Sequence, residues 1–74
     1  TGHEYIALKS LSTREFEIFR MLAESRSKQD ISLTLNISPK TVSNCHYLIK
    51  NKLNVSSDIE LIYLAIRMNV IDLF

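Results

Sequence analysis

The fold is decided by residues 37–55, ISPKTVSNCHYLIKNKLNV, because this stretch predicts one long amphipathic helix. Ser38 is a good N-cap, since its hydroxyl can accept a hydrogen bond from a free backbone N–H at a helix start. Pro39 follows at the first helical position, where the missing N–H costs nothing and the fixed φ suits a helix. No helix-breaking residue follows before Leu53, where we expect the helix to end.

This helix is predicted to have an apolar and a polar face. At about 100° per residue, four apolar side chains fall within roughly 80° of one another. They are Val42, Cys45, Ile49 and Leu53. The opposite side, which we call the polar face, has no acid, although an ordinary solvated face usually mixes both signs of charge. Its residues are Lys40, Ser43, Asn44, Tyr47, Lys50 and Asn51. Such groups contact phosphates and base edges, so the pattern favours nucleic-acid binding over a polar surface without a partner.

Length and composition bound the class of protein. Seventy-four residues make one domain at most, and the apolar share of 46% is enough for a globular core. One Gly and one Pro leave few turns, which favours helices over a small β fold. No apolar run approaches the roughly 18 residues of a membrane span, and no signal peptide is recognisable. A single Cys excludes an internal disulfide and a cysteine zinc cluster, and it fits a reducing interior.

The net charge of +1 is unevenly distributed along the chain. Residues 26–54 hold five cationic side chains and one acid, a net of +4, and the remainder holds four cations and seven acids, a net of −3. One face is therefore expected to be electropositive. The near-zero total also allows a second hypothesis, a helical dimerisation or protein-interaction module with weak or lost DNA binding.

Capping signals place two helices before the long one. Ser12 as N-cap and Glu15 at N3 form a capping box that opens a helix ending near Glu24. Ser27 can cap the next helix, and Asn36 can end it because Asn tolerates the left-handed conformation. Only two residues then separate this helix from the long one, so the two must cross steeply. This arrangement predicts a helix-turn-helix unit.

A second capping box, Ser57 with Glu60, opens a fourth helix that should end near Met68. This helix is apolar on two sides and therefore needs two partners. The stripe expected to face the core consists of Ile59, Ile62, Tyr63 and Ile66. The stripe predicted to face a second copy of the chain consists of Leu61, Leu64, Ala65 and Met68. The alternative is that Leu61 and Leu64 are singly exposed, which is common.

The helices together predict an all-α fold, a four-helix bundle that contains a helix-turn-helix, over residues 11–74. Residues 1–10, TGHEYIALKS, show no helical pattern and are expected to form a linker or a disordered N-terminal segment. A domain this small is expected to be one piece of a longer protein.

Four sequence segments follow one another at fixed spacing: LSTREFEIFRMLAE at 11–24, SKQDIS at 27–32, ISPKTVSN at 37–44 and KLNV at 52–55. The chain resembles, over residues 11–71, the LuxR-type (GerE-like) helix-turn-helix domain at the C-terminus of NarL/FixJ-family response regulators. The resemblance implies the DNA-binding output domain of a bacterial transcriptional regulator, with its third helix in the major groove. It also implies a cytoplasmic two-component response regulator with an N-terminal receiver or ligand-sensing domain, and a homodimer on DNA through the fourth helix.

The resemblance assigns candidate site residues as well. Those that match base-reading positions are Ser43, Asn44 and Tyr47, and an Asn amide can form two hydrogen bonds with an adenine. Those that match phosphate-contacting positions at the second helix start are Ser27, Lys28 and Gln29. Further phosphate candidates are Lys40, Thr41, Lys50 and Lys52, although Thr41 has capping and packing as its alternative role.

The chain differs from the usual family pattern at several positions. Ser25 stands where a Gly is usual in the turn after the first helix, and Ser disfavours positive φ. Ser43 replaces a common Lys, which weakens a base or phosphate contact. Asp58 replaces a common Arg at the start of the last helix, and Asn69 replaces a Gly near its end. These differences bear on DNA affinity and target sequence rather than on the fold.

Cys45 and His46 raise the question of a metal or redox site, and the family usually has its His at the first of these positions. Neighbours on a helix diverge by about 100° and cannot easily bind one ion. Cys45 lies at the edge of the apolar stripe and is expected to behave as a small hydrophobe, with redox sensing as the alternative. The sequence shows no convergent Ser/His/acid set, Gly-rich phosphate loop or paired acids in an apolar setting. We therefore expect no enzymatic activity, no metal and no cofactor.

Overall fold

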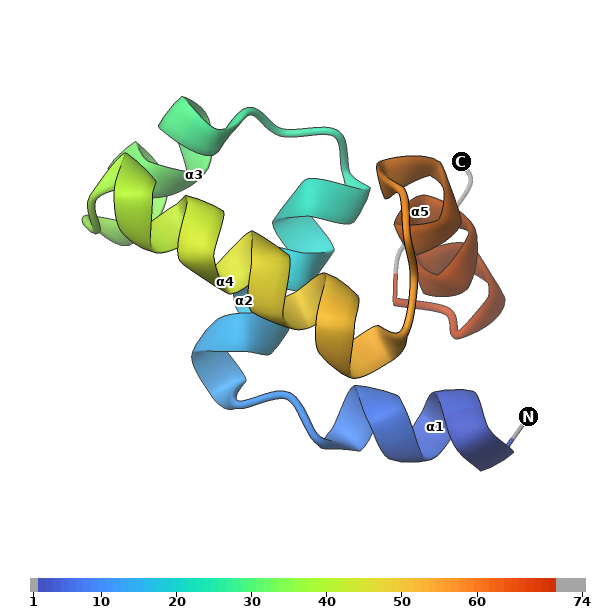
Figure 1. The fold of residues 1–74 in the computed structure, drawn as a ribbon. Coiled ribbons are helices and arrows are strands. Elements are labelled where there is room, and N and C mark those ends of the chain that lie inside the picture. Colours follow the sequence, from blue (N-terminus) through green and yellow to red (C-terminus); the bar gives the residue numbers. More distant parts are fainter. Residues whose placement is uncertain (1, 71–74) are drawn as a thin grey trace.

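The computed structural model describes residues 2–70, which form five α-helices and no strand. The helices are α1 (Gly2–Lys9), α2 (Thr13–Ala23), α3 (Lys28–Leu35), α4 (Pro39–Leu53) and α5 (Asp58–Arg67), shown in Figure 1. The all-α fold and the four helices expected after residue 11 are confirmed. Residues 71–74, which the sequence analysis includes in the domain, lie outside the described part of the chain.

Serine caps determine where α2 to α5 begin. Ser12 accepts a hydrogen bond from the backbone N–H of Glu15, and the Glu15 carboxylate accepts one from the Ser12 N–H, which completes the predicted capping box. Ser57 and Glu60 complete the second box in the same way. Each of the other two helices begins at a serine N-cap too, α3 at Ser27 and α4 at Ser38.

A residue with positive φ follows each of these four helices. The residues are Ser25 (φ 66°), Asn36 (φ 56°), Asn54 (φ 56°) and Asn69 (φ 58°). In each case the next backbone N–H donates to a carbonyl five residues earlier, as from Arg26 to Met21 at 3.1 Å and from Val70 to Ala65 at 2.8 Å. This is the Schellman geometry, which satisfies carbonyls that the helix leaves free. The turn at Ser25 therefore keeps the left-handed conformation without a glycine.

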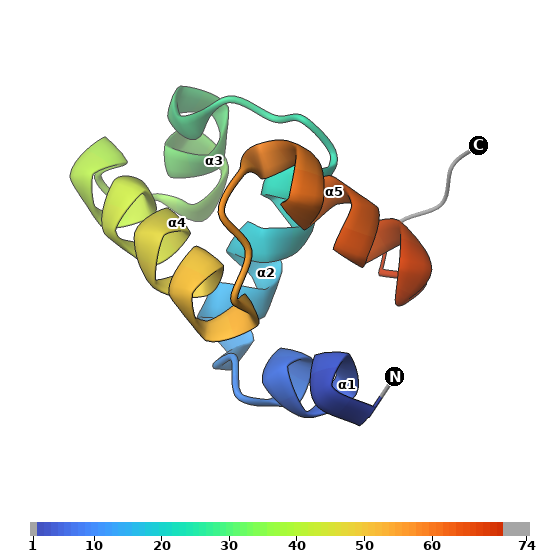
Figure 2. The ribbon, with the colours of Figure 1, turned by 45° about the vertical axis from the view of Figure 1, so that its right-hand side comes forward.

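The core lies where α2, α4 and α5 meet. In Figures 1 and 2, α3 and α4 form one side of the molecule and α5 the other, with α2 between them. Helix α4 packs against α3, α2 and α1, and α5 packs against α2. The apolar stripe predicted for α4 is confirmed, because Val42, Ile49 and Leu53 are buried and Cys45 is half-buried against the core. The other buried apolar residues are Ile18, Phe19, Met21, Ala23, Ile31, Leu61, Leu64 and Ala65.

The N-terminal segment differs from its prediction. Residues 1–10 are expected to be a linker or disordered, whereas Gly2–Lys9 form α1 beside the C-terminal part of α4 (Figures 1 and 2). Half-buried Ala7 and Leu8 pack against the core. A short helix gains most of its stability from such tertiary packing. Pattern and capping signals alone therefore could not identify this helix.

The predicted orientation of α5 is wrong. Leu61, Leu64 and Ala65, which we expected to face a second copy of the chain, are buried in the core. Ile59 and Tyr63, which we expected inside, are 63% and 57% exposed. The physical reason is that α5 is apolar almost all round between its capping box and Arg67, so periodicity offers two stripes of similar strength. The fourth member of the expected outer stripe, Met68, is half-buried and also packs against the core.

Candidate nucleic-acid interface

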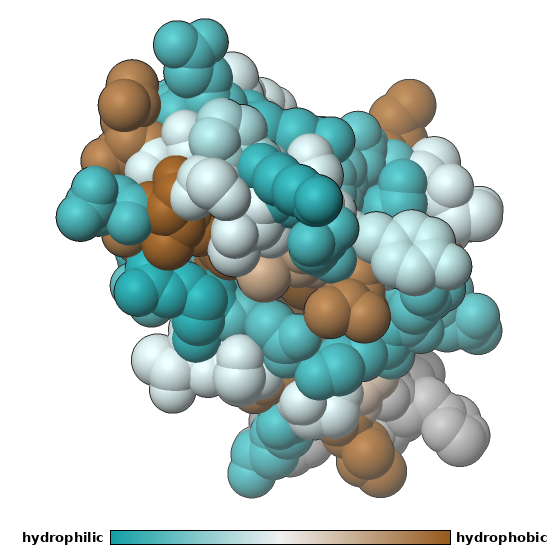
Figure 3. Space-filling view, turned by 60° about the vertical axis from the view of Figure 1, so that its left-hand side comes forward, coloured by the Kyte–Doolittle hydropathy of each residue, from teal (hydrophilic) through white to brown (hydrophobic). Residues whose placement is uncertain are grey.

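The polar face of α4 is turned away from the core. Burial of the opposite stripe fixes the rotation of the helix, so Lys40, Asn44 and Asn51 are exposed and Tyr47 is 67% exposed. Ser43, the remaining base-reading candidate, is half-buried. Figure 3 shows the side of the molecule over α3 and the start of α4, which is mainly hydrophilic with separate hydrophobic side chains. Amide and phenol groups are thus presented on a rigid helix, where they can reach a partner.

Leu48 is a feature of this surface that the sequence analysis missed. It is 46% exposed and lies outside the buried stripe of α4. At about 100° per residue it lies beside Asn44, at the edge of the polar face. An exposed aliphatic group at such a place can contact the methyl group of a thymine. The signal was available, since Leu48 falls outside the apolar stripe.

The start of α3 carries three predicted phosphate-contacting residues. Ser27, Lys28 and Gln29 are all exposed. The Ser27 hydroxyl accepts from the Asp30 N–H at 3.0 Å, so its first role is to cap the helix. Arg26 makes two hydrogen bonds to α3. Its Nε donates to Asp30 Oδ2 at 2.6 Å, and its Nη2 donates to Thr34 Oγ1 at 2.7 Å. The hydrogen bond from Arg26 lowers the pKa of the Asp30 carboxyl below its ordinary value.

The start of α4 carries two more phosphate candidates, Lys40 and Thr41, which are both exposed. The backbone N–H of Thr41 donates to Ser38 Oγ at 3.1 Å, and the two hydroxyl oxygens lie 2.9 Å apart. The Thr41 hydroxyl therefore takes part in the cap, which was its alternative role. Lys40 projects from the same turn.

The two lysines near the end of α4 have intramolecular partners. Lys52 Nζ lies 2.8 Å from Oε1 of Glu15, whose side chain is only 11% exposed. This ion pair ties α4 to α2, and the hydrogen bond from Lys52 is the largest cause of the lowered pKa of the Glu15 carboxyl. Lys50 Nζ lies 3.7 Å from Oδ1 of Asp58. Lys50 thus stays on the polar face with Asp58 beside it, whereas Lys52 joins α4 to α2.

Asp58 is the other feature that the sequence analysis did not place. It begins α5, yet its Oδ1 accepts a hydrogen bond from His46 Nε2 on α4 at 2.7 Å. This bond, followed by the charges of Lys50 and Lys28, lowers the pKa of the Asp58 carboxyl. The sequence showed an acid at this position, but the position of the loop that brings it against α4 follows only from the fold.

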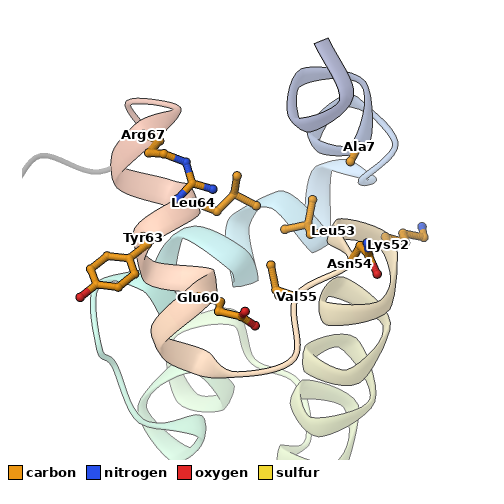
Figure 4. Close-up of a pocket in the computed structure, with 9 residues that line it drawn as sticks. All are labelled: Ala7, Lys52, Leu53, Asn54, Val55, Glu60, Tyr63, Leu64 and Arg67. Atoms are coloured by element: carbon orange, nitrogen blue, oxygen red, sulfur yellow. The ribbon is translucent and has the colours of Figure 1, made fainter. Parts of the chain in front are cut away.

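An open groove of about 550 Å³ lies elsewhere, between α1, the end of α4 and α5 (Figure 4). Its lining residues are Ala7, Lys52, Leu53, Asn54, Val55, Glu60, Tyr63, Leu64 and Arg67. None of the base-reading candidates lines it. Within the described residues, no three His, Cys, Asp or Glu side chains gather as metal ligands, and no helix is long and apolar enough to cross a membrane.

A helix-turn-helix whose second helix presents an acid-free polar face defines a class, that of DNA-binding domains. The family model described as bacterial regulatory proteins, luxR family (GerE), matches residues 9–65. The chain belongs to this family and is the DNA-binding output domain of a bacterial transcription regulator. The family consists of transcription regulators, which are generally not enzymes.

Curated relatives agree with this assignment. The chain is 47% identical to the response regulator UvrY of Escherichia coli K12 over 58 residues, which are 78% of this chain and 27% of UvrY. It is 46% identical to the response regulator GacA of Pseudomonas aeruginosa over 63 residues, 85% of this chain and 29% of GacA. It is 47% identical to the transcriptional activator protein ExaE of Pseudomonas putida over 64 residues, 86% of this chain and 30% of ExaE. The chain thus spans less than a third of the length of these relatives. No solved structure matches it.

Proposed function

We propose that this domain binds double-stranded DNA sequence-specifically with α4 in the major groove. The observation that carries the proposal is the exposed, acid-free polar face of α4, held outward by the burial of Val42, Ile49 and Leu53 on its other side. A rigid helix that presents amide, hydroxyl and ammonium groups suits the width of the major groove and its pattern of donors and acceptors.

The candidate residues divide into two roles. Asn44 reads an adenine through its side-chain amide, and Tyr47 and Ser43 contact neighbouring base edges. Phosphate contacts come from the starts of the two helices, where side chains and free N–H groups meet an anion. The residues in this role are Ser27, Lys28, Gln29, Lys40 and Thr41, with Lys50 beside them. Because Lys52 is paired with Glu15, we leave it out of this set.

The full-length protein is proposed to be a response regulator. UvrY and GacA carry that description, and this chain matches less than a third of each. The remainder leaves room for an N-terminal receiver or ligand-sensing domain, which would control the access of α4 to DNA. We place the protein in the cytoplasm because bacterial DNA is there.

A homodimer on DNA is proposed to form through the outward face of α5. Ile59 and Tyr63 are large, exposed and one turn apart, with Ile62 and Ile66 half-buried beside them. A pair of such faces around a two-fold axis would place two copies of α4 about one helical turn of DNA apart.

Fluorescence anisotropy with a labelled random-sequence duplex, titrated at several salt concentrations, tests the proposed DNA binding. Each phosphate that the domain neutralises should contribute about −0.9 to the slope of log affinity against log salt, so three or four contacts give roughly −3 to −4. No binding, or binding with a flat salt response, would contradict the proposal and favour a protein-interaction module.

A further inference from the structure

The Asp58 carboxylate lies beside a lysine that the proposed function assigns to DNA, Lys50. Its Oδ1 is 2.7 Å from His46 Nε2 and 3.7 Å from Lys50 Nζ, both on α4. The charge of Lys28, at the start of α3, acts on it as well. One acid from α5 thus contacts two side chains of the second helix of the helix-turn-helix.

The capping box that opens α5 does not include this carboxylate, which acts on the helix only as an acid in its first turn. Ser57 caps the helix, and Glu60 completes the capping box, so both N-terminal roles are filled by other residues. The Asp58 side chain is 66% exposed and therefore contributes little to the core. Its hydrogen bond and its cationic neighbours lower its pKa, so it is an anion at neutral pH. This carboxylate also affects a second anion, such as a DNA phosphate, that approaches Lys50.

We propose that Asp58 is an anionic brake on DNA binding, which competes with DNA phosphates for Lys50 and keeps the affinity of a single domain low. This inference rests on the proposed DNA binding. A phosphate that approaches Lys50 must displace the carboxylate or tolerate its repulsion, and either event costs free energy. The effect is independent of sequence, because it acts through the DNA backbone. A weakly binding single domain makes operator occupancy depend on a second domain.

The variant Asp58→Asn tests the brake, because it removes the charge and retains an oxygen that can accept from His46. We expect it to bind both a selected site and a random duplex about 1.5- to 5-fold more tightly at low salt, the range set by one exposed charge pair. The salt slope should become steeper by about 0.9, since Lys50 then neutralises one more phosphate. Unchanged helical circular dichroism shows that the variant is folded.

Glu17→Gln is the matched control, because it changes the net charge by the same amount. Glu17 lines an apolar groove between α1 and α2 that contains none of the candidate DNA-contacting residues. A double-mutant cycle adds a measurement that would not change if Asp58 had only a structural role. Lys50→Ala should cost less affinity in the natural chain, where Asp58 already occupies the ammonium, than in Asp58→Asn.

The outcomes separate the two proposals. Tighter binding by Asp58→Asn than by Glu17→Gln, with the steeper slope, supports the brake, as does binding that emerges only in Asp58→Asn. Equal affinities for the two variants overturn it. Weaker binding by Asp58→Asn also overturns it, because Asp58 would then position Lys50 for DNA. If neither the natural domain nor Asp58→Asn binds DNA, the proposed function itself fails.

Discussion

Asn44 is the residue on which base recognition is expected to depend. Its side chain is exposed on the polar face, and its amide matches the acceptor and donor on the major-groove edge of adenine. We predict that Asn44→Ala lowers affinity for the best site by about 1–3 kcal/mol and leaves affinity for random duplex nearly unchanged. Paired titrations of a selected site and a random duplex, at one salt concentration, measure the difference.

Lys40→Ala is the control for that prediction. Lys40 is exposed on the first turn of α4 and is expected to meet a phosphate, which carries no sequence information. Its loss should weaken both duplexes alike and flatten the salt slope by about 0.9. If Asn44→Ala behaves in the same way as Lys40→Ala, Asn44 does not read a base.

Ser25 is the second residue with a sharp prediction, and here the measured quantity is stability. Its φ of 66° lies in the left-handed region, where a side chain with a Cβ is disfavoured. We expect Ser25→Gly to raise the free energy of unfolding by about 0.5 kcal/mol, the strain relieved less the entropy that glycine adds to the unfolded chain. Urea denaturation measures this. Ser25→Ala, which keeps the Cβ, should give no gain, and a loss of stability in Ser25→Gly would contradict the explanation.

At the scale of elements, the Glu15–Lys52 ion pair joins α2 to the last turn of α4. We predict that Glu15→Gln lowers the free energy of unfolding by about 1 kcal/mol near pH 7, since Gln also serves at N3 of a capping box and only the charge is lost. The natural carboxyl has a folded pKa below its ordinary value of 4.5. Its contribution is therefore present above that pH and is lost as the pH falls through the folded pKa.

The measurement is urea denaturation of both chains at a series of pH values. The stability difference between the natural chain and Glu15→Gln should shrink as the pH falls below about 4.5. Lys52→Gln should lose a similar amount, and the double variant should lose little more than either single one. A difference that does not vary with pH would show that charge is not the cause.

Elements with strong local signals could be predicted from the sequence, and elements that depend on tertiary packing could not. The serine caps and Asn36 and Asn54 located α2 to α4 because each of these residues satisfies backbone groups by itself. In α5 the caps were equally clear, but the core selected the side of Leu64 over that of Tyr63, which no local signal distinguishes. Helix α1 packs against α4, a contact that no local signal in its sequence indicates.

In the candidate site, too, local features could be predicted from the sequence and tertiary contacts could not. The polar face followed from helical periodicity, because it is the complement of the buried stripe. The partners of Lys50 and Lys52 did not, since Asp58 and Glu15 are distant in sequence from the side chains they meet. Such contacts depend on how α4 lies against α2 and α5. Sequence spacing therefore identified the cationic residues. It could not show which of them have partners within the protein.

At the scale of the whole molecule, the outward face of α5 is expected to pair two domains on DNA. We predict that Tyr63→Glu abolishes cooperative binding to a duplex with two half-sites while binding to a single site remains. The reason is that Tyr63 is 57% exposed, so the new carboxylate is solvated in one domain and loses water only in the pair.

Sedimentation velocity on the two-site duplex distinguishes one bound domain from two. The companion variant Leu64→Glu should instead unfold the domain, because Leu64 is buried and a charge there costs several kcal/mol. Unchanged cooperativity in a folded Tyr63→Glu variant would place the interface on another surface.

The most direct test of the central claim, that α4 meets DNA through its polar face, is the amide NMR spectrum of the labelled domain with and without a short duplex. The structure predicts that perturbed amides concentrate at the start of α3 and along α4, from Lys40 to about Asn51. Those of α1 and of the groove between α1 and α5 should change little at one domain per duplex. Perturbations centred on α1 and that groove, with α4 unaffected, would contradict the claim.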